Sequence, residues 1–110
     1  MATRDAELVQ AMQLILGTAL GERPMRPEYG CRIHDYVFAS FNPTTEGEMI
    51  MAVHDALSMW EPRVDVTSVD IVQDENEQSL LYIDIHYEPK GTYDPRNLVF
   101  PFYTIPGGDE

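Results

Sequence analysis

The sequence LYIDIHY, at residues 81–87, alternates large apolar side chains with more polar ones. The side chains at its odd positions share one face: Leu81, Ile83, Ile85 and Tyr87. A period of two is typical of a β-strand that packs one face on a core. An acidic segment at 74–78 precedes this stretch, and another alternating stretch occupies 64–71. We therefore predict a β-hairpin, with a bulge near Thr67 and Ser68 because the alternation changes phase there.

A third strand is predicted downstream, at 97–103. Its apolar side chains alternate between two faces, with Leu98, Phe100 and Phe102 on one and Val99 and Tyr103 on the other. Pro101 lacks a backbone N–H, which confines such a strand to the edge of a sheet. An edge strand of this kind can accept a strand from a partner protein. A third strand whose two faces are simply covered is equally compatible with the pattern.

The residues before the hairpin have a helical period instead. One helix is predicted over 5–20, capped by Asp5 or Thr3 and ended by Gly21. Its buried stripe consists of Leu8, Val9, Met12, Ile15, Leu16, Ala19 and Leu20. The prolines that follow predict a stiff, non-helical connector over 21–30.

Two further helical segments are predicted before the strands. Ile33, Val37 and Phe41 are spaced four apart and indicate one or two helical turns over 33–41. A longer helix over 45–60 begins with a capping box formed by Thr45 and Glu48. Its buried stripe consists of Met49, Ile50, Val53, Ala56, Leu57 and Trp60. The sequence thus predicts an α+β fold, with three N-terminal helices packed on a small three-stranded antiparallel sheet.

Length and charge limit the possible functions. The chain has 110 residues and 44% apolar content, which suits one domain over residues 1–110. Its net charge of −12 argues against binding nucleic acid or an anionic membrane surface. The N-terminus lacks the apolar segment of a signal peptide, so we expect synthesis in the cytoplasm. The lone Cys31 excludes an internal disulfide and is expected to act as a small apolar side chain.

The sequence offers little support for catalysis. The three histidines, His34, His54 and His86, lie on different predicted elements without the close spacing of a metal motif, and no nucleotide-binding loop is present. We therefore predict no catalytic residue, no metal and no cofactor. A glycosidase needs only two carboxylates, and Glu22, Glu28 and Glu61 are the candidates beside prolines and glycines.

Glu61 lies at the end of the 45–60 helix, where the helix dipole disfavours a carboxylate by ~0.3–1 kcal/mol. We therefore expect a cationic partner for Glu61, either Arg63 or Arg23. The resulting corner either pins the helix to the sheet or binds another protein.

Three stretches resemble the lysozyme-like baseplate wedge family of contractile phage tails, which also serves type VI secretion systems and extracellular injection particles. They are ILGTALGERPMRPEYGC at 15–31, ALSMWEPRV at 56–64 and LVFPFY at 98–103. Their order and spacing match the family over nearly the whole chain. The sequence begins almost directly at its first predicted helix, whereas many members carry an extended segment before it, so a contact made by that segment is not carried over to this chain.

The resemblance implies a structural role in a sixfold baseplate, where the chain joins wedge proteins and templates the first ring of the contractile sheath. It implies a wedge-contact motif formed by Gly21, Glu22, Arg23, Glu61, Pro62 and Arg63. It also implies a sheath-pairing strand formed by Leu98, Val99, Phe100, Pro101, Phe102 and Tyr103. Two alternatives remain open: an enzyme that cleaves peptidoglycan, and a free regulatory module like a bacterial anti-adaptor of related fold.

Overall fold

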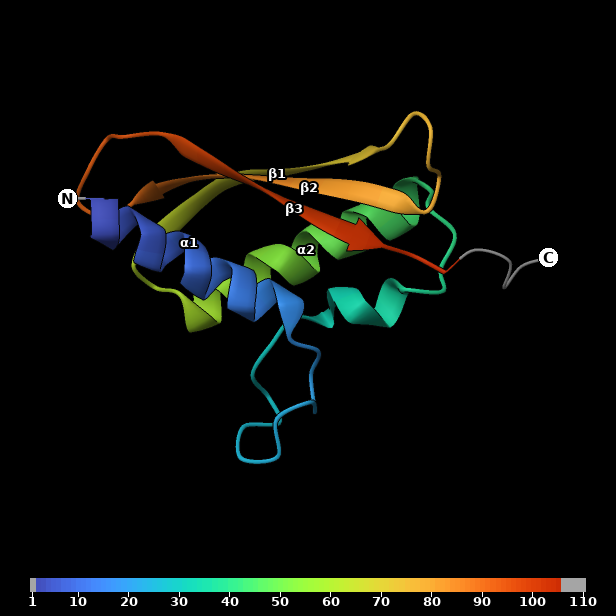
Figure 1. Cartoon of the computed structure of the whole chain (residues 1–110), viewed down its shortest axis with the longest axis horizontal. Coiled ribbons are helices and arrows are strands. Elements are labelled where there is room, and N and C mark those ends of the chain that lie inside the picture. The colour runs from blue at the N-terminus through green and yellow to red at the C-terminus, as the bar shows by residue number, and fades with distance from the viewer. Residues whose placement is uncertain (1, 106–110) are drawn as a thin grey trace.

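The computed structural model describes residues 2–105, with side chains from residue 5 onward, and arranges them as helices on one face of a sheet (Figure 1). The elements are α1 (Ala2–Gly17), the 3-10 helix η1 (Arg32–Tyr36), α2 (Pro43–Trp60), β1 (Val64–Gln73), β2 (Leu80–Pro89) and β3 (Arg96–Tyr103). The three strands form one antiparallel sheet in the order β1-β2-β3. The α+β class and the three-stranded sheet are therefore confirmed.

The register of β1 against β2 also confirms the predicted bulge. Val66 pairs with Tyr87 and Ser68 pairs with His86, so Thr67 is the additional residue on β1. The Thr67 hydroxyl donates a hydrogen bond to the His86 carbonyl oxygen at 3.0 Å. The bulge changes the phase of β1, and it allows Val64 and Val69 both to reach the core.

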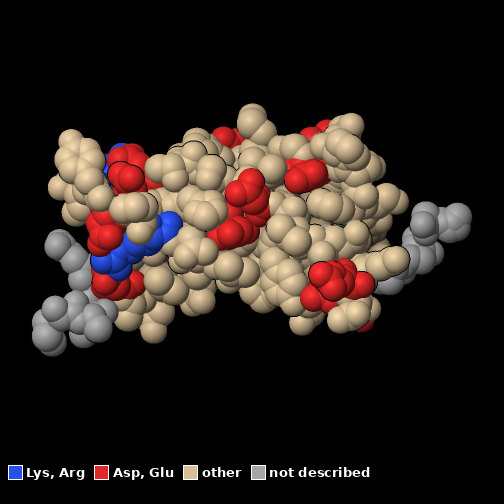
Figure 2. Space-filling view, turned by 90° about the horizontal axis from the view of Figure 1, so that it is seen from above, with Lys and Arg blue, Asp and Glu red and all other residues tan. Residues whose placement is uncertain are grey.

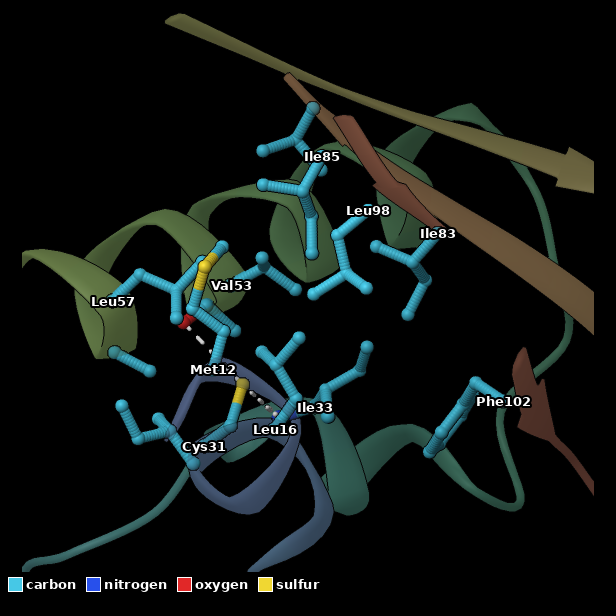
Figure 3. Packing of buried hydrophobic residues seen from close by; sticks show 14 of the residues in the cluster. Met12, Leu16, Cys31, Ile33, Val53, Leu57, Ile83, Ile85, Leu98 and Phe102 are labelled. Carbon is cyan, nitrogen blue, oxygen red and sulfur yellow. Dashed lines mark hydrogen bonds between the residues drawn. The ribbon is translucent and has the colours of Figure 1, made fainter. Parts of the chain in front are cut away.

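The core lies between the helices and one face of the sheet (Figure 3). Along β2 the predicted side chains alternate as expected, with Leu81, Ile83, Ile85 and Tyr87 all buried. Helices α1 and α2 contribute the opposing side chains, among them Met12, Leu16, Val53 and Leu57. The other face of the sheet is open, because no described element covers it (Figure 1, and Figure 2 from above).

The prediction of three helices is wrong in one respect: within 33–41 only residues 33–36 are helical, as part of the five-residue 3-10 helix η1, so the described residues contain two α-helices. Cys31 caps η1, since its Sγ accepts a hydrogen bond from the Ile33 N–H. Ile33 is fully buried, whereas Val37 and Phe41 are only half-buried against the core. One buried anchor holds a short turn and does not support a longer helix.

The predicted end of the first helix is also wrong. α1 ends at Gly17, three residues before Leu20. The Thr18 hydroxyl donates to the Leu14 carbonyl, and the Thr18 carbonyl accepts from the Cys31 N–H at 2.9 Å. Ala19 then forms a parallel bridge with Cys31, so contact with a distant residue ends the helix. Gly21 lies in the connector with φ +83° and does not cap α1.

The predicted caps at the helix starts need correction too. α2 begins at Pro43, and Asn42 is its N-cap because the Asn42 Oδ1 accepts a hydrogen bond from the Thr45 N–H at 2.9 Å. Thr45 therefore lies inside the helix and does not form the predicted capping box. Asp5 is in the first turn of α1 and forms an ion pair with Arg96 at 2.5 Å, while the side chain of Thr3 lies outside the described part.

Candidate functional site

The Glu61-Pro62-Arg63 corner joins α2 to β1. Pro62 cannot continue the helix, and the Glu61 N–H donates to the Leu57 carbonyl at 2.9 Å. The Glu61 side chain turns inward and is 4% exposed. Arg63 binds it through two hydrogen bonds, from Nε to Oε2 at 2.6 Å and from Nη2 to Oε1 at 2.9 Å. The expected cationic partner of Glu61 is therefore confirmed as Arg63.

The ion pair fixes the charge of the corner. The hydrogen bonds from Arg63 lower the pKa of Glu61 below its ordinary value of 4.5, although burial opposes this effect. The same hydrogen bonds raise the pKa of Arg63. The Arg63 side chain remains 56% exposed, so the part of the guanidinium that does not bind Glu61 is accessible to a carboxylate of another protein.

The second predicted motif, Gly21-Glu22-Arg23, begins the connector, which forms a loop extending away from the body of the molecule (Figure 1). The Glu22 Oε1 accepts a hydrogen bond from the Ala19 N–H at 2.9 Å and so stabilises the start of the loop. The Arg23 guanidinium lies 4.7 Å from the centroid of the Tyr29 ring. Arg23 therefore stacks within its own loop and is not the partner of Glu61.

Aromatic side chains bring the two motifs together. The rings of Tyr29 and Trp60 meet edge to face at 5.2 Å, and the Arg26 guanidinium lies 5.2 Å from the Trp60 centroid. Because Trp60 directly precedes Glu61, this stack attaches the connector to the Glu61-Pro62-Arg63 corner. The stack was not predicted from the sequence, although each of its aromatic residues lies within one of the quoted motifs.

The edge position predicted for β3 is confirmed, because β3 has a neighbour only on the β2 side. Past the end of the strand, the Thr104 N–H donates to the Ser79 carbonyl at 2.7 Å. Along an antiparallel strand, the N–H and C=O groups of successive residues point to opposite edges. The even-numbered residues of β3 therefore bond toward β2, as Thr104 does. The odd-numbered residues, Asn97, Val99, Pro101 and Tyr103, direct their backbone groups to the free edge. Pro101 therefore leaves a gap at the free edge and removes no bond to β2.

The side chains of β3 follow the predicted alternation. Leu98 and Phe102 are buried against the helices, and Phe100 is half-buried. Val99 and Tyr103 lie on the open face and are 47% and 59% exposed. The strand thus presents apolar side chains and free backbone groups next to each other, which suits the addition of another strand.

The structure places the other candidate residues in structural roles or at the surface. His34 Nε2 donates to the Leu16 carbonyl at 2.7 Å, His54 is exposed, and His86 lies beside Asp70 and Asp84. Within the described residues, no three His, Cys, Asp or Glu side chains are placed to hold a metal ion. Burial raises the pKa of the Cys31 thiol to about 11. Across residues 2–105 no helix is long and apolar enough to cross a membrane.

Of the carboxylates named for glycoside hydrolysis, Glu61 is unsuited to the role of general acid. A general acid needs a raised pKa, whereas that of Glu61 is lowered by Arg63. Glu22 and Glu28 are exposed side chains of the connector, and Glu22 is bound to the Ala19 N–H.

Comparisons with known proteins agree on one family. The profile of the family described as "Baseplate wedge protein gp25" matches residues 2–93. The baseplate wedge protein gp25 of Enterobacteria phage T4 is 30% identical over 67 residues, which are 61% of this chain and 51% of that protein. The matched region thus spans about half the length of this relative.

Solved structures share the fold. A protein of Geobacter sulfurreducens with a provisional assignment as a tail lysozyme is 42% identical and superposes with a TM-score of 0.86, over 96% of this chain and 95% of that one. A chain of the anti-feeding prophage baseplate, from a sixfold-symmetrised structure, is 26% identical with a TM-score of 0.72, over 80% of this chain and 70% of that one.

Proposed function

The chain belongs to the baseplate wedge protein gp25 family, and from this membership we propose that it is a structural subunit in the baseplate of a contractile injection machine. In this role it joins wedge proteins and templates the first ring of the contractile sheath within a sixfold assembly. The observation that carries the proposal is the free edge of β3, where backbone groups without a neighbouring strand lie beside exposed apolar side chains. The protein is made in the cytoplasm and acts without catalysis or a cofactor.

We assign the sheath contact to β3 rather than to β1, the other edge of the sheet. The bulge at Thr67 interrupts the β1 edge, and carboxylates such as Asp65 and Asp70 project from this strand. Bulges and charges are the features by which proteins protect an edge from strand addition. On β3, Asn97 and Val99 present an uninterrupted outward segment before Pro101, so a strand of the sheath protein pairs there.

The wedge contact is assigned to the exposed side of Arg63. Glu61 is buried and serves to orient the guanidinium, so it does not itself reach a partner. Arg63 then binds a carboxylate of a wedge protein, with Pro62 exposed beside it. Gly21, Glu22 and Arg23 support the same surface indirectly, through the stack of Tyr29 on Trp60.

A proline scan along β3 tests the sheath contact. Val99→Pro removes an N–H from the free edge, whereas the matched variant Phe100→Pro removes an N–H that bonds to β2. We expect Val99→Pro to fold, to enter the baseplate and to block sheath polymerisation when it is produced with the other proteins of its own particle. Phe100→Pro is expected to lower the melting temperature more than Val99→Pro does.

Electron microscopy of the purified particles gives the readout. Baseplates without sheath are expected for Val99→Pro, and a control substitution on the other edge strand, Val72→Thr, is expected to leave full-length sheaths. Full-length sheaths on baseplates that contain Val99→Pro would refute the assignment of β3.

A further inference from the structure

Phe100 is the least covered of the three apolar side chains that β3 directs toward the helices. Its neighbours on this face, Leu98 and Phe102, are 8% and 5% exposed, whereas Phe100 is only half-buried. The three side chains share one face because alternate residues of a strand point the same way. The core is therefore incomplete at the middle of β3, which is the free edge of the sheet.

Helix α1 lies beside β3 and runs in the same direction (Figure 1). At one end, Asp5 of α1 forms an ion pair with Arg96 of β3. At the other end, His34 links the two elements: its Nε2 lies 2.7 Å from the Leu16 carbonyl oxygen, and its ring centroid lies 5.8 Å from that of Phe102. α1 therefore follows β3 over most of the length of the strand.

Val9 belongs to the stripe of α1 that faces β3. It follows Asp5 by four residues, and residues four apart lie on the same side of a helix. Four residues of helix advance about 6 Å and two residues of strand about 7 Å, so Val9 is level with Leu98, two residues along β3 from the ion pair. Val9 is half-buried, and the next residue of the stripe, Gln13, is exposed. Val9 and Phe100 thus border one partly covered strip, the α1–β3 seam.

The free edge of β3 determines what kind of segment covers this seam. Asn97 and Val99 direct their backbone groups to the edge, in the same part of the strand as the seam. An extended segment satisfies such a row of groups, and it lies about 4.8 Å from the strand that it joins. Its side chains alternate between the two faces of the sheet. Those on one face therefore lie over the seam, and those on the other lie on the open face beside Val99, which is 47% exposed.

We propose that the strand added to β3 carries three consecutive apolar residues opposite residues 98–100, and that α1 forms part of its binding site. The two outer residues of the three point toward the helices, where one contacts Val9 and the other covers Phe100. The middle residue lies on the open face beside Val99. This inference rests on the proposed addition of a sheath strand to β3, and it extends the site from the edge of the sheet to the helix α1.

Val9→Glu tests the part of the site that α1 supplies. The side chain is half-buried at the flank of a helix, so we expect the variant to fold and to enter the baseplate. An added strand would bury the new carboxylate without a cation, so we expect about tenfold fewer sheathed particles per baseplate. The control Leu14→Glu places the same charge where α1 is 49% exposed, and it is expected to leave full-length sheaths. Val9→Ile keeps the apolar contact and should leave them as well.

Cysteine labelling measures coverage of the seam directly. The native Cys31 is buried, and burial raises its pKa to about 11, so a maleimide reports on an introduced thiol alone. We expect Val9→Cys to react in the isolated protein and to lose this reactivity in sheathed particles. Leu14→Cys is expected to react in both, which shows that the reagent reaches α1 in the particle.

Val99→Pro separates failure of the seam from failure of the proposed function. Full-length sheaths on Val99→Pro baseplates would overturn strand addition itself, and the contact with α1 would fall with it. If Val99→Pro blocks the sheath and Val9→Glu retains it, strand addition stands and the contact with α1 is wrong. Unchanged reactivity of Val9→Cys in sheathed particles, or equal protection of Leu14→Cys, would also overturn the contact with α1.

Discussion

Arg63→Ala isolates the energetic role of the buried ion pair. The substitution leaves the Glu61 carboxylate, on a side chain that is 4% exposed, without the two hydrogen bonds that hold its charge. Removing one partner of a buried pair typically costs ~3–5 kcal/mol. Because the Arg63 side chain is 56% exposed, we expect a value near the lower end, about 3 kcal/mol at pH 7. For a chain of this length, that loss lowers the melting temperature by about 12 °C.

The pH dependence has a definite sign. In the unmodified chain the pKa of Glu61 is lowered below the ordinary value of 4.5. The ionised Glu61 therefore adds to the free energy of unfolding above pH 4.5, and this contribution is lost as the pH falls through the lowered pKa. In Arg63→Ala, burial without a cation raises the pKa of Glu61 instead. As the pH falls, protonation of Glu61 removes its uncompensated charge from the variant. The difference in unfolding free energy between the two proteins therefore becomes smaller in acid.

Urea denaturation at pH 7 and at pH 4 measures both effects. The matched control is Arg32→Ala, whose ion pair with Asp35 is exposed and 3.8 Å long, and which we expect to change stability by less than about 0.5 kcal/mol. The double variant Glu61→Gln/Arg63→Ala carries no buried charge and is expected to be more stable than Arg63→Ala at pH 7. A cost of less than about 1 kcal/mol for Arg63→Ala at pH 7, well below the range for a broken buried pair, would refute this role of Arg63.

Other predictions concern the connector, α2 and the buried thiol. Gly30 has φ +129°, and a Cβ there would collide with the Thr18 carbonyl oxygen, so Gly30→Ala should lower the unfolding free energy measured in urea by about 2 kcal/mol or more. Gly47 is inside α2 and faces open space, so Gly47→Ala should raise the unfolding free energy by roughly 0.5–1 kcal/mol. A destabilised Gly47→Ala, or a Gly30→Ala as stable as the unmodified chain, would contradict this backbone geometry. Asn42→Ala should lose the cap of α2 and about 1 kcal/mol by thermal unfolding, and an unchanged melting temperature would argue against the cap. Cys31 should resist alkylation in the native protein at pH 8 because burial raises its pKa to about 11, and labelling as fast as in urea would contradict its burial.

The strands were predictable because their signals are local. The alternation at 81–87 fixes which face of β2 meets the core, and the change of phase near Thr67 indicates the bulge. Pro101 indicates an edge strand for a steric reason that holds in any context. The direction of its missing N–H could not be predicted from sequence, since it depends on the register between β2 and β3.

The helix ends and the candidate surfaces depend on contacts between distant residues. The apolar period continues through Ala19 and Leu20, so the sequence extends α1 too far, whereas the pairing of Ala19 with Cys31 ends it earlier. The position of Glu61 at a helix end predicted a cationic partner for it. The burial of Glu61 could not be predicted from that position. The pocket that Leu20 and Trp60 line could not be predicted either, because its lining residues are far apart in the sequence.

Residue-resolved hydrogen exchange of β3 tests the central claim most directly. In the isolated protein we expect fast exchange at the outward amides of Asn97, Val99 and Tyr103, and slow exchange at those of Leu98 and Phe102, which bond to β2. In baseplates carrying sheath, exchange at the three outward amides should become slow, as a strand of the sheath protein pairs with them. Fast exchange at all three in sheathed particles that contain the protein would contradict strand addition at this edge.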